Sequence, residues 1–139
     1  MNAKMWIVLA GILGALGVSL GAYHAHGLEK LLAGEGLNQA EIDRRMDFCE
    51  VGVRYQMYHA LALLGLGVLC AQRPSRCLNI TGTLLLTGVV LFTGPLVATA
   101  FLNLSVHWAI VPTGGMLMIV GWASLAIAGL RIHSANSNR

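Results

Sequence analysis

Four long stretches of this sequence contain no charged side chain. A helix rises about 1.5 Å per residue, so about 20 apolar residues cross a hydrocarbon core about 30 Å thick. Inside lipid, backbone groups find no water, and only helices or closed barrels satisfy them. The four stretches show no strand-like alternation of apolar and polar residues. We therefore predict an all-α membrane protein, a bundle of four transmembrane helices at about residues 5–23, 55–71, 77–102 and 109–130.

The composition excludes a water-soluble domain of this size. Of 139 residues, 56% are hydrophobic and 11% are charged, whereas soluble domains carry about 25% charged residues. The net charge of +3 comes from scattered Lys and Arg residues without a basic face, so no nucleic-acid partner is expected. The three cysteines form no CxxC pair, which argues against a disulfide framework or a zinc cluster. We treat residues 1–139 as a single integral membrane domain in contact with the lipid bilayer.

The distribution of Lys and Arg residues predicts that both termini face the cytoplasm. The turn that contains Arg73 and Arg76 is very short and adjoins two predicted membrane ends. The connection at residues 103–107, on the opposite side, has no Lys or Arg, and positive charge favours the cytoplasmic side. The side of the termini also carries Lys4, Arg131 and Arg139, against Lys30, Arg44, Arg45 and Arg54 on the other side.

Residues 24–54 form a polar segment that contains all six acidic residues. Asn38 followed by Glu41 has the spacing of a capping box and predicts the start of a helix. Apolar residues such as Ile42 and Met46 then recur at helical spacing. We predict a short amphipathic helix in this first loop, lying along the membrane surface or covering the mouth of the bundle, with a polar face made of Glu41, Arg44, Arg45 and Asp47.

Small residues align on one face of the first and fourth predicted spans. Glycine lets two helix backbones approach closely, so these faces favour tight packing between helices. The first span also has the length of a signal-peptide core, but aligned glycines fit a retained helix better. The glycines predicted to pack are Gly11, Gly14, Gly17, Gly21, Gly114 and Gly121.

Pro95 lies well inside the third apolar stretch. Proline removes one backbone hydrogen bond and clashes with the preceding turn. The sequence therefore predicts a kink or an early helix end at Pro95, with a threonine available to satisfy a freed carbonyl group.

Histidine and amide side chains gather near the predicted non-cytoplasmic ends of the spans. Such a cluster would suit a metal ion, proton transfer or a haem, or simply hydrogen-bonded packing. No carboxylate or cysteine completes a recognised ligand spacing, so we predict no metal and no cofactor. The candidate polar cluster consists of His24, His26, Gln56, His59, Asn103 and His107.

Several motifs together resemble those of the YgdD-like family of small membrane proteins. They are GAYHAHGL at residues 21–28, VRYQMYHAL at 53–61, LFTG at 91–94 and VPTGG at 111–115. In that family the first motif usually reads GAFGAHGL, so His26 matches it and His24 replaces a glycine. Gln56 and His59 match the pattern YQxxHA, whereas Pro95 replaces a serine. The resemblance implies a four-span protein of the bacterial inner membrane with no established activity and with a eukaryotic transmembrane counterpart.

The sequence favours a membrane protein that is not an enzyme. No charged residue lies deep in a predicted span, and no phosphate-binding loop or nucleophile elbow is present. The leading hypothesis is that the protein acts by helix packing with itself as a homo-oligomer, with lipid, or with another membrane protein. The alternatives are a small-solute or proton pathway lined by His26, Gln56 and His59, and a metal or haem site at the histidine-rich face.

Overall fold

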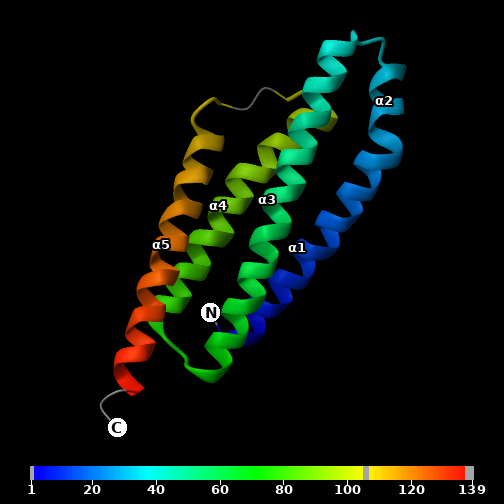
Figure 1. The fold of residues 1–139 in the computed structure, drawn as a ribbon. Helices are drawn as coiled ribbons and strands as arrows, with labels where there is room; N and C mark the ends of the chain where they lie inside the picture. The colour runs from blue at the N-terminus through cyan, green and yellow to red at the C-terminus, as the bar shows by residue number, and fades with distance from the viewer. Residues whose placement is uncertain (1, 105–106, 137–139) are drawn as a thin grey trace.

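The computed structural model describes residues 2–104 and 107–136, with the backbone alone for residues 131–136. Its regular elements are all helical, as Figure 1 shows, and the expected all-α class is confirmed. The elements are α1 (Ala3–Tyr23), the π-helical η1 (His24–Leu28), α2 (Glu29–Gly34), α3 (Gln39–Gln72), α4 (Arg76–Leu102) and α5 (Ile110–Asn136).

Polar side chains fix the start of α1 and α4 by accepting hydrogen bonds from backbone amides that lack a helical partner. The side-chain oxygen of Asn2 accepts from the Met5 amide at 3.1 Å at the start of α1. Ser75 Oγ accepts from the Cys77 amide at 3.2 Å at the start of α4. At the other end of α4, Asn103 adopts the left-handed conformation with φ 49° and closes the helix.

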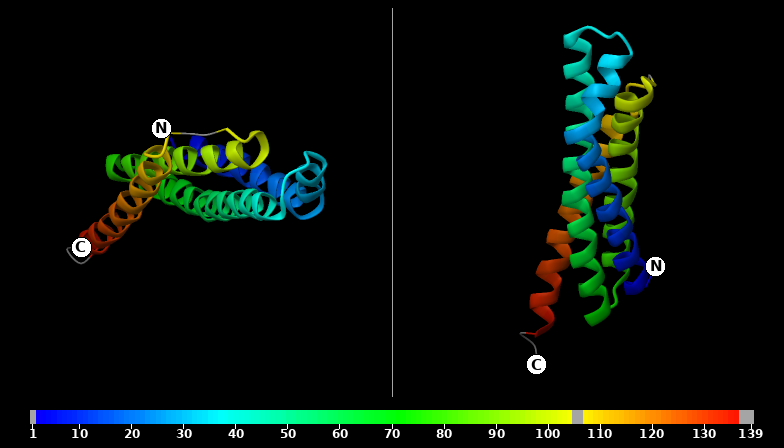
Figure 2. Two further views of the ribbon diagram at one scale, coloured as in Figure 1. Left: turned by 90° about the horizontal axis from the view of Figure 1, so that it is seen from above. Right: turned by 90° about the vertical axis from the view of Figure 1, so that its right-hand side faces the viewer.

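The four long helices run up and down beside one another. α1 packs along α3, α3 along α4, and α4 along α5. In Figure 1 the α2–α3 turn lies near the end of α4 and the start of α5, and we call this the upper end. The N-terminus, the α3–α4 turn and the C-terminus lie at the lower end. Figure 2 shows that α5 diverges from the other helices toward its C-terminal end.

Three helical stretches of the described chain are long and apolar enough to cross a membrane: Ala3–Gly34, Arg76–Leu102 and Ile110–Leu130. They contain the predicted spans 5–23 and 77–102 and match the predicted span 109–130 except for its first residue. α3 is not among these stretches, because its first half is charged and Gln56 and His59 lower the hydropathy of its second half. The span at residues 55–71, and with it the count of four, stays a prediction.

The first loop differs from its prediction. A helix does begin after Asn38, whose Oδ1 accepts from the Glu41 amide at 3.0 Å. However, this helix is not a separate short segment on the membrane surface, because α3 continues unbroken to Gln72. No proline interrupts it, and Gly52 is accommodated where α3 meets α4. The residues before it are also helical, since α1 passes through η1 into α2 and forms a hairpin with α3.

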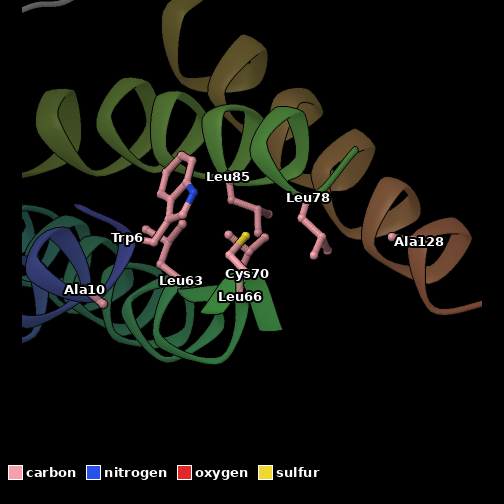
Figure 3. Packing of buried hydrophobic residues seen from close by; sticks show 8 residues of the cluster. All are labelled: Trp6, Ala10, Leu63, Leu66, Cys70, Leu78, Leu85 and Ala128. Carbon is pink, nitrogen blue, oxygen red and sulfur yellow. The ribbon is translucent and has the colours of Figure 1, made fainter. Parts of the chain in front are cut away.

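The lower core is centred on Trp6, whose side chain is fully buried. Figure 3 shows Trp6 beside Leu63 of α3 and Leu85 of α4. The indole Nε1 donates a hydrogen bond to Asn79 Oδ1 at 2.9 Å, which satisfies a polar group inside an apolar core. A Cβ atom built on Gly82 would lie 2.6 Å from the indole ring, so this position of α4 must lack a side chain.

The upper core joins the hairpin to α3 and to the end of α4. Leu28, Leu32, Ile42, Cys49 and Ala100 are its buried members. Removal from water disfavours the thiolate, and burial raises the pKa of Cys49 to about 11. Cys49 is therefore a protonated packing residue at neutral pH.

The contact between α4 and α5 is closest at two glycines. A Cβ atom built on Gly114 would lie 2.6 Å from the Phe92 backbone nitrogen and 2.8 Å from the Gly88 carbonyl oxygen. Pro95 lies in the same part of α4, and the helix continues past it to Leu102, so the early helix end does not occur. Thr99 Oγ1 donates to the carbonyl oxygen of Pro95 itself at 2.9 Å.

We predict that Gly114→Ala destabilises the protein by about 1–3 kcal/mol, because the new methyl group would overlap backbone atoms that cannot move aside. The measurement is thermal or denaturant unfolding of the purified protein in detergent, followed by circular dichroism. Gly65→Ala is the matched control, since a Cβ atom built on Gly65 meets nothing within 4 Å. Equal stability of Gly114→Ala and Gly65→Ala would contradict this close contact.

Candidate functional site

One face of α3 is buried along its whole length, and we call it the α3 seam. Its members follow one another at alternating intervals of three and four residues, the spacing that keeps one helix face against its neighbours. Arg45, Gln56 and His59 are its charged or polar side chains. Since a buried polar group without a partner costs free energy, these three side chains are the candidate functional groups. The seam consists of Ile42, Arg45, Cys49, Gly52, Gln56, His59, Leu63, Leu66 and Cys70.

Gln56 connects α3 to the middle of α1. Its side chain is 5% exposed, and Nε2 donates to the Leu13 carbonyl oxygen at 2.8 Å. A Cβ atom built on Gly17 would lie 3.5 Å from the same nitrogen, so the amide nitrogen is held against α1. Gln56 therefore lies beside the centre of α1 and not at the end of the bundle.

His59 lies one turn further along the α3 seam and connects α3 to α5. Trp122 Nε1 donates to His59 Nε2 at 3.2 Å, and the two rings meet edge to face. Because an indole nitrogen only donates, Nε2 must accept, and the ring proton must be on Nδ1. Nδ1 lies 2.8 Å from the Tyr55 carbonyl oxygen and donates to it. Both ring nitrogens of this neutral imidazole are thus engaged.

The other members of the candidate polar cluster lie apart from this pair. His24 and His26 belong to η1, where His24 is half-buried and His26 is exposed. Asn103 and His107 are exposed between α4 and α5, and His107 Nδ1 accepts from the Ala109 amide at 3.4 Å. η1 and this connection lie toward the upper end in Figure 1. Within the described residues, no group of three or more His, Cys, Asp or Glu side chains is placed to hold a metal ion.

Arg45 is a buried residue that the sequence placed on an exposed polar face, and that prediction is wrong. Its side chain is 1% exposed. Nε donates to the Ala100 carbonyl oxygen at 2.8 Å, and Nη1 donates to Glu35 Oε2 at 2.8 Å. A cation at the C-terminal end of a helix is stabilised by unpaired carbonyl groups and the helix dipole. The seven-residue interval from Arg45 to Gly52 was the signal that could have identified this buried position.

The six glycines predicted to pack divide into two groups. Four of them lie against a neighbouring helix: Gly17 and Gly21 against α3, and Gly114 and Gly121 against α4. Cβ atoms built on Gly11 and Gly14 meet nothing within 4 Å. These two glycines line a groove of about 310 Å³ between α1 and α3, together with Ile7, Ala10, Met57, Ala60, Leu61 and Leu64.

We predict that the hydrogen bond between Trp122 and His59 couples α5 to α3. Trp122→Phe keeps an aromatic ring but removes the donor, which leaves His59 Nε2 without a partner and costs about 0.5–1.5 kcal/mol. A double-mutant cycle with His59→Leu should give a coupling free energy of about 0.6 kcal/mol, measured by denaturant unfolding in detergent. Strictly additive effects of the two substitutions would contradict the bond.

The comparisons with known proteins cover most of this helical chain. Residues 20–115 match a family described as a protein of unknown function, DUF423. The chain is 38% identical over 128 residues to a UPF0382 membrane protein of Staphylococcus epidermidis, covering 92% of this chain and 97% of the relative. It is 35% identical over 130 residues to the UPF0382 membrane protein YwdK of Bacillus subtilis, covering 92% and 98% of the two chains.

A further relative carries the name used for the resemblance. The chain is 31% identical over 132 residues to the UPF0382 inner membrane protein YgdD of Escherichia coli K12, covering 95% of this chain and 94% of the relative. No solved structure matches. The resemblance to the YgdD-like family is confirmed, and this chain belongs to the DUF423 family of membrane proteins of unknown function.

Proposed function

We propose that this protein crosses the bacterial inner membrane four times, with both termini in the cytoplasm, and acts without catalysis by lateral association of its helices. The relative from Escherichia coli is named an inner membrane protein, which supports the location. The unbroken course of α3 supports a fourth span at residues 55–71, because it continues from the upper end to the lower end beside α1 and α4.

The distribution of charge along the bundle supports the orientation. At the lower end, Arg73 and Arg76 lie in or directly after the short turn between α3 and α4, and Lys4 lies at the start of α1. At the upper end, the connection between α4 and α5 contains no Lys or Arg. Because Lys and Arg near span ends favour the cytoplasmic side, the lower end is assigned to the cytoplasm.

The open groove beside Gly11 and Gly14 is the observation that carries the proposed association. Several glycines of this structure lie against a neighbouring helix, as at Gly17 and Gly114. At Gly11 and Gly14 the space over the backbone is open. Lipid chains are as apolar as side chains, so helix association in a membrane depends on close van der Waals packing, which glycine permits.

A second copy of this chain is the proposed occupant of the groove. α1 also presents an exposed ridge formed by Val8 and Ile12, which are 48% and 51% exposed and follow the groove residues Ile7 and Gly11 in the sequence. A two-fold axis would place the ridge of each copy in the groove of the other. The same surface of each copy then contributes both the ridge and the groove. Another membrane protein or lipid chains in the groove are the competing outcomes.

We predict the orientation from cysteine accessibility in a variant whose three native cysteines are replaced by alanine. Ala40→Cys at the start of α3 should react with a membrane-impermeant maleimide in intact cells. Gln72→Cys at the other end of α3 should react only after lysis. Both positions are exposed, so the difference reports the side of the membrane. The reverse pattern would overturn the orientation, and equal reaction from one side would overturn the fourth span.

We predict a disulfide-linked dimer when Gly11→Cys is oxidised in native membranes. The same cysteine-free background is used, and the yield is read from non-reducing gels. Ile119→Cys, on the outer face of α5 and 62% exposed, is the control for random collision in the bilayer. A dimer yield no higher than that of Ile119→Cys would refute self-association through α1, and a crosslink to another protein would replace the second copy with that partner.

A further inference from the structure

A second groove lies on the opposite flank of α1, and it differs from the first in having polar groups at its base. Its volume is about 210 Å³, and residues of α1, α3 and α4 line it. It shares no lining residue with the groove at Gly11 and Gly14. The lining residues are Leu13, Leu20, Gln56, Val89, Val90, Thr93, Gly94 and Val97.

The amide of Gln56 presents its oxygen to this groove. The nitrogen is held on the α1 side by the Leu13 carbonyl group, which leaves Oε1 on the other side of the amide plane. Among the described residues nothing donates a hydrogen bond to Oε1. Within the described residues, every fully buried side-chain nitrogen or oxygen has a hydrogen-bond partner. Because Oε1 has no partner, it is not fully buried, and we take it to be accessible from the groove that Gln56 lines.

Thr93 lines the same groove. Its hydroxyl proton is used, because Oγ1 donates to the Gly52 carbonyl oxygen at 3.1 Å. Thr93 therefore does not donate to Gln56 Oε1, which stays the acceptor of this groove. The rest of the lining is aliphatic apart from Gly94. The complementary molecule therefore has an aliphatic body and a hydrogen-bond donor at its end.

The depth of the groove restricts the occupant further. Leu13 lies at the middle of α1, half a membrane thickness from either helix end. Val90 at the rim is 55% exposed on the outer surface of the bundle, so the groove opens sideways. A phospholipid keeps its polar head at the membrane surface, and its acyl chains carry no donor. A neutral lipid alcohol lying in the bilayer can bring a hydroxyl group to this depth.

We infer that this groove binds the hydroxyl-bearing end of an aliphatic lipid alcohol, which donates its hydrogen bond to Gln56 Oε1. At about 30 Å³ for each water-sized group, the groove holds about seven such groups, which corresponds to a hydroxyl and its first carbon atoms. The remainder of a longer chain extends through the open side into lipid. This site is independent of the association through Gly11, because the two grooves lie on different flanks of α1.

The test uses the full-length purified protein in phosphatidylcholine nanodiscs. The probes are a diazirine derivative of 1-octanol and the matching diazirine of octane, at equal concentration in the membrane. After photolysis, mass spectrometry locates the labelled residues. The alcohol should label the α4 segment at residues 89–97 about fivefold more than the alkane, the factor expected for one neutral hydrogen bond. Unlabelled 1-octanol should compete, and hexadecane should not.

Two variants and a control separate the hydrogen bond from general lipid contact. Gln56→Leu should reduce labelling by the alcohol to the level of the alkane, and Val90→Trp should reduce labelling by both probes because the indole fills the groove. Thr83→Val, on the exposed side of α4, should change neither. Equal labelling of the native protein by alcohol and alkane would overturn the inference, whether or not Gln56→Leu folds. Undiminished alcohol labelling of folded Gln56→Leu would also overturn it.

Discussion

Hydrogen bonding of the polar side chains on the α3 seam is the constraint on which the arrangement of the helices depends. The seam passes from the upper core through the middle of the bundle to the lower core. A polar side chain buried without any hydrogen bond costs free energy, and each of these three side chains bonds to another helix. Gln56 reaches the backbone of α1, His59 reaches Trp122 of α5, and Arg45 reaches the end of α4. These three bonds join α3 to each of the other long helices.

The buried polar side chains that suggested a chemical role mostly form hydrogen bonds that hold the helices together. Both ring nitrogens of His59 form hydrogen bonds, and the ring is neutral because Nε2 accepts from the indole of Trp122. For His59 to bind a metal or haem through Nε2, its hydrogen bond with Trp122 would have to break. Arg45 holds the upper hairpin to α4, and its charge is paired with that of Glu35. Both proposals therefore concern the outer surface of α1 and α4. One flank of α1 is a purely apolar groove suited to another helix, and the other holds the unpaired oxygen of Gln56.

Several features were predictable because they depend on neighbouring residues. Asn38 and Glu41 marked the start of α3, and apolar length marked α1, α4 and α5. The prediction of a separate surface helix failed because hydrophobic periodicity indicates that a helix is present but not where it ends. No proline follows Asn38 before the α3–α4 turn, so the helix continues. Arg45 was misplaced because a charged residue is ordinarily exposed. The histidines were grouped because they lie near the ends of the predicted spans. In the structure, however, Gln56 and His59 lie further down the bundle than η1.

The sequence by itself determined that this chain is helical and belongs in a membrane, because long apolar segments in lipid can satisfy their backbone groups in no other open-chain form. It also determined membership of the family, through motifs that extend over most of the chain. Only the tertiary structure decided which polar groups meet. A hydrogen bond between Trp122 and His59 depends on how far α5 is displaced along α4 and α3, and a shift of one helical turn, about 5.4 Å, would separate the two rings. That displacement is set by contacts such as Gly114 against Gly88, between residues distant in sequence.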